Sequence, residues 1–357
     1  ESILANVAGH AEFIQRIGSY LSPTELLNLY CASRHFNSMI ENCMRSSFYR
    51  WSLLHAPKGM FVFDWRHWQY RHLIKEDKSF RSKVSPPLLG PLKGGEPKIH
   101  KRMIPTMKWF QMICFREEIV SDILATLARQ GLRYPRGTSI SVMKLWRLLD
   151  LRTTKERNLL IQDKNIFTDV DLWNMQHFLC KLALRFNDPV YGPESCDVVT
   201  LFMSQKSLLP LWELLFGHKY YSVHSFLQLK IRTDLGHKWH LPDGSDWQGP
   251  DKNLILGVPA REVGQLYLGT DGKKLVRPAS LIATESARRQ LHLEDHILNM
   301  FLWGFVDLRT GNNLGPTEQE IFMKDEDRKN RSIDTTNEFT KYHARNALWH
   351  ALSRDEK

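Results

Sequence analysis

The sequence lacks long hydrophobic runs, paired cysteines and the opening of a secretion signal. No stretch of about 18 consecutive apolar residues occurs, so we expect no membrane span. The chain does not open with a basic segment followed by an apolar one, so we expect no signal peptide. Its five cysteines are scattered and form no CxxC pair. This pattern argues against a disulfide framework and favours reduced thiols in the nucleus or the cytoplasm.

Motifs of the common enzyme chemistries are missing as well. The sequence has no P-loop, no GxGxxG after a strand, no GxSxG and no HExxH. The nearest approach to a metal site is the spacing of His237, His240, Asp243 and Asp246, in a segment rich in glycine and proline. Zinc sites use tighter groups of cysteine and histidine, so an ordinary loop is the favoured interpretation. We therefore predict a protein that is not an enzyme, with no catalytic residue, no metal and no cofactor.

The composition is that of a folded, aromatic-rich protein. The chain has 357 residues, of which 42% are hydrophobic and 25% are charged, and its eleven Trp and eighteen Phe favour packed helices. The length suggests two or three structural units. We predict a mainly α fold, with an N-terminal three-helix module followed by an irregular helical body that contains a small β-hairpin.

The positive charge is concentrated in residues 45–116, which carry fifteen basic and four acidic side chains, a net charge of +11. Such a segment attracts acidic proteins or nucleic acid, although a solvated surface is the more common explanation. Within it, residues 61–71 interleave aromatic and basic side chains. This arrangement suits the stacking of aromatic side chains on the bases of a single-stranded nucleic acid. It equally suits a helix capped by Asp64, with Trp65 and Trp68 facing inward. We favour the helix, so nucleic acid is not the favoured partner. The candidates for an acidic-partner or nucleic-acid surface are Arg66, Arg71, Lys75, Lys101 and Arg102.

The first forty residues read as three short helices. Apolar side chains at helical spacing predict the first, namely Phe13, Ile14, Ile17, Tyr20 and Leu21. Ser22, Pro23 and Glu25 form a capping box with proline at the first helical position, which predicts the start of the second. A third helix holds Phe36 and Ile40. Three such helices cannot bury all their apolar surface, so one face needs a partner.

These residues resemble the F-box. The resemblance covers residues 9–51 and is carried by the segment from Phe13 to Ile40, with its SPxELLxL core and the following SRxF, and by the aromatic-basic run at 48–51. It implies a three-helix module that docks on the Skp-type adaptor of a cullin–RING ubiquitin ligase. Gly9 and His10 stand where the family has Leu-Pro. The family's adaptor-binding positions fall on Ile17, Leu21, Pro23, Leu26, Leu27 and Phe36.

The rest of the chain divides by composition into a connector and a body. We predict the F-box-like module over 1–52, a basic aromatic connector and Pro/Gly-rich linker over 53–105, and a helical body over 106–357. Residues 172–192 resemble the helical body of filamentous-fungal F-box proteins of unassigned function. The expected elements of the body are helices over 108–129, 141–151, 168–186, 196–216, 291–305 and 337–352, and a hairpin near 265–276.

Two functions fit these features. In the first, the chain is a substrate receptor that joins an unidentified protein substrate to the adaptor and, through it, to a cullin; the SPxELLxL core favours this hypothesis. In the second, the chain is an architectural subunit of a nuclear, chromatin-associated complex. The substitution of Leu-Pro by Gly9-His10 and the concentrated positive charge favour the second hypothesis.

Overall fold

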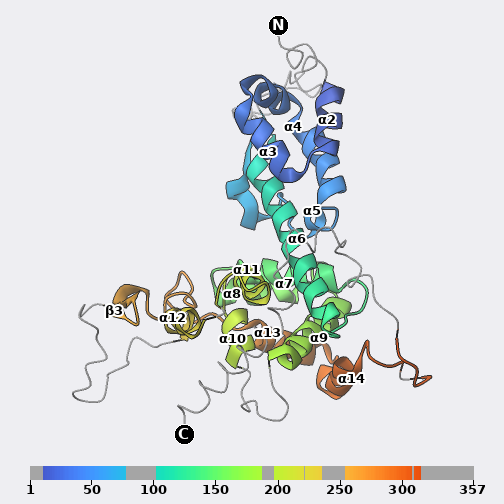
Figure 1. Cartoon of the computed structure of the whole chain (residues 1–357), viewed down its shortest axis with the longest axis vertical. Helices are drawn as coiled ribbons and strands as arrows, with labels where there is room; N and C mark the ends of the chain where they lie inside the picture. Colours follow the sequence, from blue (N-terminus) through green and yellow to red (C-terminus); the bar gives the residue numbers. More distant parts are fainter. Residues whose placement is uncertain are drawn as a thin grey trace, which may run out of the picture. The chain divides into compact units, whose positions relative to one another are not determined.

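The computed structural model describes residues 11–77, 102–186, 197–220, 222–234, 254–307 and 309–314. It confirms a mainly helical protein with a small β-hairpin (Figure 1). The expected helix over 337–352, most of the expected linker and the histidines at 237 and 240 lie outside the described residues. The chain forms two compact units, Glu1–Glu118 and Ile119–Lys357. Each is considered by itself.

Unit 1 begins with the three helices that the sequence predicts. A complete capping box starts the second helix: Glu25 N donates to Ser22 Oγ, and Ser22 N donates to the Glu25 carboxylate at 2.8 Å. Ser33 caps the third helix through a 3.2 Å bond from Phe36 N. The elements of unit 1 are α2 (Ala11–Tyr20), α3 (Pro23–Ala32), α4 (Arg34–His55), α5 (Gly59–Val62), the 3-10 helix η1 (Trp68–Leu73), β1 (Ile74–Glu76), β2 (Met103–Pro105) and the first half of α6 (Met107–Arg129).

Some described residues of the expected connector, namely Val62, Phe63, Tyr70 and Ile104, are buried in the core of unit 1. The rings of Phe48 on α4 and Phe110 on α6 stack with centroids 5.7 Å apart, and Trp51 lies 6.1 Å from Phe110. Strands β1 and β2 pair antiparallel, with Ile74 opposite Pro105. Residues on both sides of the expected linker therefore share one core, so unit 1 extends beyond the expected boundary at residue 52.

The segment around Asp64 differs from its expected form. Instead of capping an α-helix, the Asp64 carboxylate accepts the Arg66 backbone N–H at 3.0 Å, which is a local turn. The 3-10 helix η1 follows, and Trp68 is 46% exposed. The Asp64 carbonyl also accepts the His67 N–H at 3.0 Å, which closes a turn, so the aromatic spacing forms no inward-facing α-helical stripe here.

Unit 2 is built mostly from helices of 6 to 18 residues. Two predictions are confirmed closely, since α6 ends two residues before Gly131 and a capping box of Thr168 and Asp171 begins α9. The helical segment expected over 196–216, for which Pro210 predicts a kink, is two separate helices. Pro210 lies in the first turn of the second helix, where its missing N–H costs nothing. The helices are the end of α6, α7 (Thr138–Leu149), α8 (Thr154–Gln162), α9 (Asp169–Phe186), α10 (Asp197–Met203), α11 (Leu209–Leu215), α12 (Val223–Asp234), η2 (Ala260–Glu262), α13 (Pro278–Arg289), η3 (Leu293–His296) and α14 (Ile297–Leu302).

The small β structure of unit 2 lies mainly before the expected hairpin. Near 265–276 only one bridge forms among the described residues, between Leu268 and Lys274, around a turn at Gly272. The two-stranded hairpin is β3 (Leu254–Ile255) with β4 (Val258–Pro259). Its turn residues, Leu256 and Gly257, have φ of 47° and 80°, the left-handed pair that a tight hairpin favours.

Buried cations join the elements of unit 2. The Arg157 side chain is fully buried and donates to the carbonyls of Leu149, Leu151 and Val276 at 2.9–3.2 Å. Arg289 pairs with Glu285 and Asp169 and also donates to two backbone carbonyls. These guanidinium groups hold loops against helices, because each satisfies several carbonyls that would otherwise be buried without a donor.

Helix α9 carries two further buried polar groups toward α14. The Lys181 ammonium donates at 2.8 Å to the carbonyls of Phe301 and Trp303, at the C-terminal end of α14, where a cation is stabilised. The His177 ring lies 5.5 Å from the Trp303 ring and 6.0 Å from that of Tyr134, and neither ring nitrogen has a hydrogen-bond partner among the described residues. Burial lowers the pKa of His177 to about 3.

Candidate functional site

The first candidate site is an incompletely covered apolar face on α2 and α3. Helix α2 contacts α4 through its small and polar residues: Trp51 Nε1 donates to the Gln15 carbonyl at 3.0 Å, and a Cβ at Gly18 would lie 2.2 Å from Trp51 Cε2. The close approach at Gly18 fixes which side of α2 is buried. Phe13 and Tyr20 remain largely exposed on the same helix.

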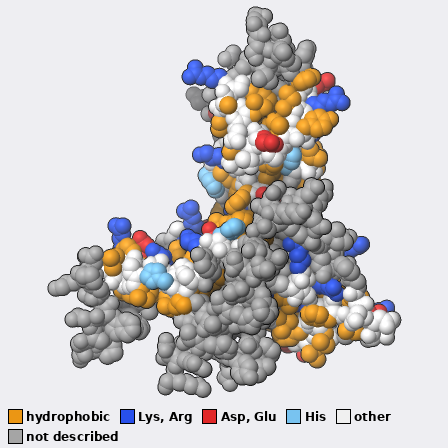
Figure 2. All heavy atoms as spheres, viewed as in Figure 1, with side chains coloured by type: hydrophobic (Ala, Val, Ile, Leu, Met, Phe, Trp, Pro, Cys, Tyr) orange, Lys and Arg blue, Asp and Glu red, His pale blue; other side chains and the backbone are white. Residues whose placement is uncertain are grey.

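Two stripes of apolar side chains remain partly accessible, one on each helix. On α2, Phe13 is 47% exposed and Tyr20 is 81% exposed. On α3, Pro23 and Leu27 are four residues apart, which places them on the same side of the helix. We call this set the hairpin face, and it consists of Phe13, Ile17, Tyr20, Leu21, Pro23 and Leu27. Figure 2 shows hydrophobic side chains gathered on the visible side of unit 1 around these helices.

The structure separates the six predicted adaptor-binding residues into two groups. Ile17, Leu21, Pro23 and Leu27 are half-buried and belong to the hairpin face. Two others are inside the unit's own core: Leu26 is 0% exposed and Phe36 is 5% exposed. These two side chains pack inside unit 1 in the isolated chain, so their contribution to docking remains a prediction.

The capping box fixes the corner between the two helices. Ser22 bonds to Glu25 through both its backbone N–H and its hydroxyl, and these bonds lower the pKa of the exposed Glu25 carboxyl. With proline at the first helical position, the start of α3 is set by local chemistry. The positions of Leu21 and Leu27 on either side of this corner are therefore fixed by the sequence between them.

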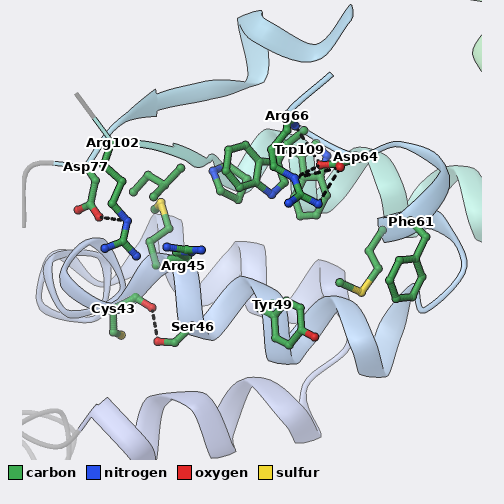
Figure 3. Close-up of a pocket in the computed structure, with 15 residues that line it drawn as sticks. Cys43, Arg45, Ser46, Tyr49, Phe61, Asp64, Arg66, Asp77, Arg102 and Trp109 are labelled. Carbon is green, nitrogen blue, oxygen red and sulfur yellow. Dashed lines mark hydrogen bonds and ion pairs between the residues drawn. The ribbon is translucent and has the colours of Figure 1, made fainter. Parts of the chain in front are cut away.

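The second candidate site is a pocket of about 650 Å³ in unit 1. Its walls come from α4, α5, the turn at Asp64, the ends of β1 and β2, and the start of α6 (Figure 3). Arg66 pairs with Asp64 at 2.9 Å, and Arg102 Nε lies 3.6 Å from Asp77 Oδ2. The lining residues are Cys43, Met44, Arg45, Ser46, Tyr49, Met60, Phe61, Asp64, Trp65, Arg66, Asp77, Arg102, Ile104, Pro105 and Trp109.

Only two of the five residues predicted to form a basic surface line the pocket. Arg66 and Arg102 line it, whereas Lys75 pairs with Glu41 and Arg71 is exposed elsewhere. Lys101 lies outside the described residues. The sequence reasoning did not select Arg45, since nothing but its place in a basic segment distinguishes it.

The described residues contain neither a candidate metal site nor a candidate membrane-spanning helix. No group of three or more His, Cys, Asp or Glu side chains in this part of the chain could hold a metal ion. Among the same residues, no helix is both long and apolar enough to cross a bilayer. The pronounced features that remain are the hairpin face and the arginine-lined pocket.

Comparison with known proteins identifies no relative from which a function could be inferred. No family model matches the chain, and neither a curated protein nor a solved structure matches it. The geometry of the hairpin face and the pocket is therefore the basis for any functional conclusion.

Proposed function

We propose that the chain is a non-catalytic protein-interaction subunit, an F-box-type substrate receptor that docks on a Skp-type adaptor and, through it, on a cullin. The observation that carries the proposal is the hairpin face. Four residues at positions of the F-box resemblance, Ile17, Leu21, Pro23 and Leu27, are only half-buried. Covering partly exposed apolar side chains on a second protein removes them from water, which favours association.

Docking through this face needs no rearrangement of unit 1. The α2–α4 contact at Gly18 and the capping box at Ser22 already hold the two helices in place. A preorganised face loses little conformational entropy when it binds, which helps a small surface to reach useful affinity. A receptor of this kind acts by raising the local concentration of its substrate near a ubiquitin-charged partner.

Copurification tests the proposal with variants chosen from the burial pattern. We expect Leu27→Asp to abolish recovery of the adaptor and cullin, because it places a charge in the docking contact. Asn28→Asp is the matched control, since it adds the same charge at a neighbouring exposed position. Unchanged adaptor recovery with Leu27→Asp would remove the F-box proposal. Leu26→Asp is unsuitable, because its fully buried side chain would couple docking to unfolding.

The alternative is an architectural subunit of a nuclear, chromatin-associated complex that uses the same helices for assembly. Gly9 and His10 in place of the family's Leu-Pro favour it, as does the pocket lined by Arg45, Arg66 and Arg102. The same copurification separates the two functions. Stoichiometric recovery of a nuclear assembly that contains no cullin would support the alternative.

A further inference from the structure

Arg45 differs from the other two arginines of the pocket in having no acidic partner. The guanidinium groups of Arg66 and Arg102 lie beside Asp64 and Asp77. Within the described part of the chain, Arg45 forms neither an ion pair nor a hydrogen bond. Figure 3 shows it between the other two arginines, which each have a dashed line to an aspartate. The pocket thus has one cation available to a ligand.

The surfaces around Arg45 are apolar and aromatic. Met44, Ile104 and Trp109 are buried side chains that line the pocket. Two aromatic residues of the lining are largely accessible: Tyr49 is 60% exposed and Phe61 is 69% exposed. Tyrosine, tryptophan and arginine are the residue types that dominate binding energy at protein interfaces. The volume of about 650 Å³ lies within the range of pockets that enclose small groups of side chains or ligands.

We propose that this pocket binds a short acidic segment of a partner protein, in which one carboxylate pairs with Arg45 and a neighbouring apolar side chain enters between Tyr49 and Phe61. Arginine and a carboxylate form two parallel charge-assisted hydrogen bonds, so one unpaired guanidinium suffices for such a group. The lining belongs to α4 and later segments, so the proposal does not depend on adaptor docking at the hairpin face.

The charges of the pocket favour a peptide over nucleic acid. Three arginines and two aspartates line it, and the carboxylates of Asp64 and Asp77 would repel a continuous row of phosphates. A nucleic-acid strand gains affinity by neutralising several phosphates at once, which requires several unpaired cations. One unpaired arginine beside apolar walls matches a single carboxylate next to an apolar side chain.

Fluorescence anisotropy of the full chain tests the proposal. The probes are a set of labelled short peptides, each with a glutamate or aspartate beside a leucine or phenylalanine, their amide counterparts, and a single-stranded oligothymidylate. The variants are Arg45→Ala and, as a matched control, Arg34→Ala, which removes an exposed arginine from the start of the same helix. Melting curves establish that both variants remain folded.

We expect at least one acidic peptide to bind, and its amide counterpart to bind about tenfold more weakly, because a charge-assisted bond is lost. Arg45→Ala should weaken binding of the acidic peptide by about tenfold, whereas Arg34→Ala should change it by less than about twofold, since a remote exposed charge is screened.

Three results would overturn the proposal. One is the absence of binding by every acidic peptide at about 1 mM, the weak limit of specific recognition. Another is an equal loss of affinity in Arg45→Ala and Arg34→Ala, which would show attraction to net charge alone. The last is tighter binding of oligothymidylate that depends on Arg45, which would assign the pocket to nucleic acid.

Discussion

The two units of the chain place some of their positively charged side chains in different ways. Unit 2 buries cations such as Arg157 and Lys181 and saturates them with backbone carbonyls. Unit 1 leaves Arg45 exposed at a pocket and leaves Tyr20 and Leu54 more than half exposed. A buried cation that bonds only to the protein's own backbone stabilises the fold, whereas an accessible cation beside exposed aromatic rings remains available to a partner. Burial together with bonding thus separates structural charges from binding charges.

The largest expected effect sharpens the contrast within α3. Leu26→Asp places a charge in the core of unit 1 and should lower its free energy of unfolding by about 4 kcal/mol or more, enough to unfold a marginal unit. Leu27→Asp, one residue away and half-buried, should cost less than about 1 kcal/mol. Urea unfolding followed by circular dichroism measures both. Equal losses would show that Leu27 is also a core residue and does not belong to a docking face.

A second prediction compares arginines of the two units. Arg157→Met leaves three carbonyls, two of them buried, without this donor and should destabilise unit 2 by about 3 kcal/mol. Arg45→Ala should change stability by less than about 0.5 kcal/mol, because the exposed guanidinium has no ion pair or hydrogen bond with the described residues. Thermal melting of the two variants checks this difference. A large loss with Arg45→Ala would make it a structural residue.

Because His177 of unit 2 is buried, we expect the free energy of unfolding to decrease as the pH falls. The pKa of His177 falls to about 3 in the folded chain, so between the ordinary value of 6.5 and about 3 the unfolded chain binds a proton that the folded chain does not. This contribution to stability is complete above pH 6.5 and is lost as the pH falls through that window. At pH 4.5 the loss amounts to about 2 to 3 kcal/mol.

His177→Phe should remove that part of the acid sensitivity, because phenylalanine preserves the ring contacts with Tyr134 and Trp303 and binds no proton. Urea titrations of the wild type and the variant at pH 7 and pH 4.5 measure the change. Equal losses of stability in the two proteins would show that His177 is not the group responsible.

A further effect on stability concerns the contact that orients α2. Gly18→Ala introduces a Cβ about 2.2 Å from Trp51, whose indole N–H is held by the Gln15 carbonyl. The overlap should destabilise unit 1 by about 1 to 3 kcal/mol despite the better helix propensity of alanine. Ser19→Ala on the same helix is the control and should melt close to the wild type. A stabilised Gly18→Ala variant would indicate that α2 and α4 are not in close contact.

Local chemistry made much of the fold predictable. The capping boxes at Ser22 and Thr168 place the starts of α3 and α9, and Gly131, with φ of 86°, follows the end of α6. The same rule could have placed α8, whose Thr153 and Glu156 form a third capping box. These features depend on residues three or four positions apart, so they can be read directly from the sequence.

Long-range contacts were not predictable in this way. The stacking of Phe48 on Phe110 joins residues on both sides of a proline- and glycine-rich segment, whose composition suggested separate parts. For the candidate site, helical spacing identified the apolar residues of α2 and α3, but it could not show that Leu26 is fully buried while Leu27 is not. That distinction depends on where α4 packs. The role of Arg45 could not be predicted either, because only its position in the folded pocket distinguishes it from the other basic residues of the segment.

Calorimetric titration of the full chain with purified Skp-type adaptor measures directly whether the hairpin face binds that adaptor. We predict a one-to-one complex whose formation has a negative heat-capacity change, the mark of buried apolar surface. Leu27→Asp should weaken binding at least about tenfold, while Asn28→Asp should bind like the wild type, because only the former lies on the face. A wild-type chain that gives no complex with the adaptor, or a Leu27→Asp variant that binds it unchanged, would contradict the account.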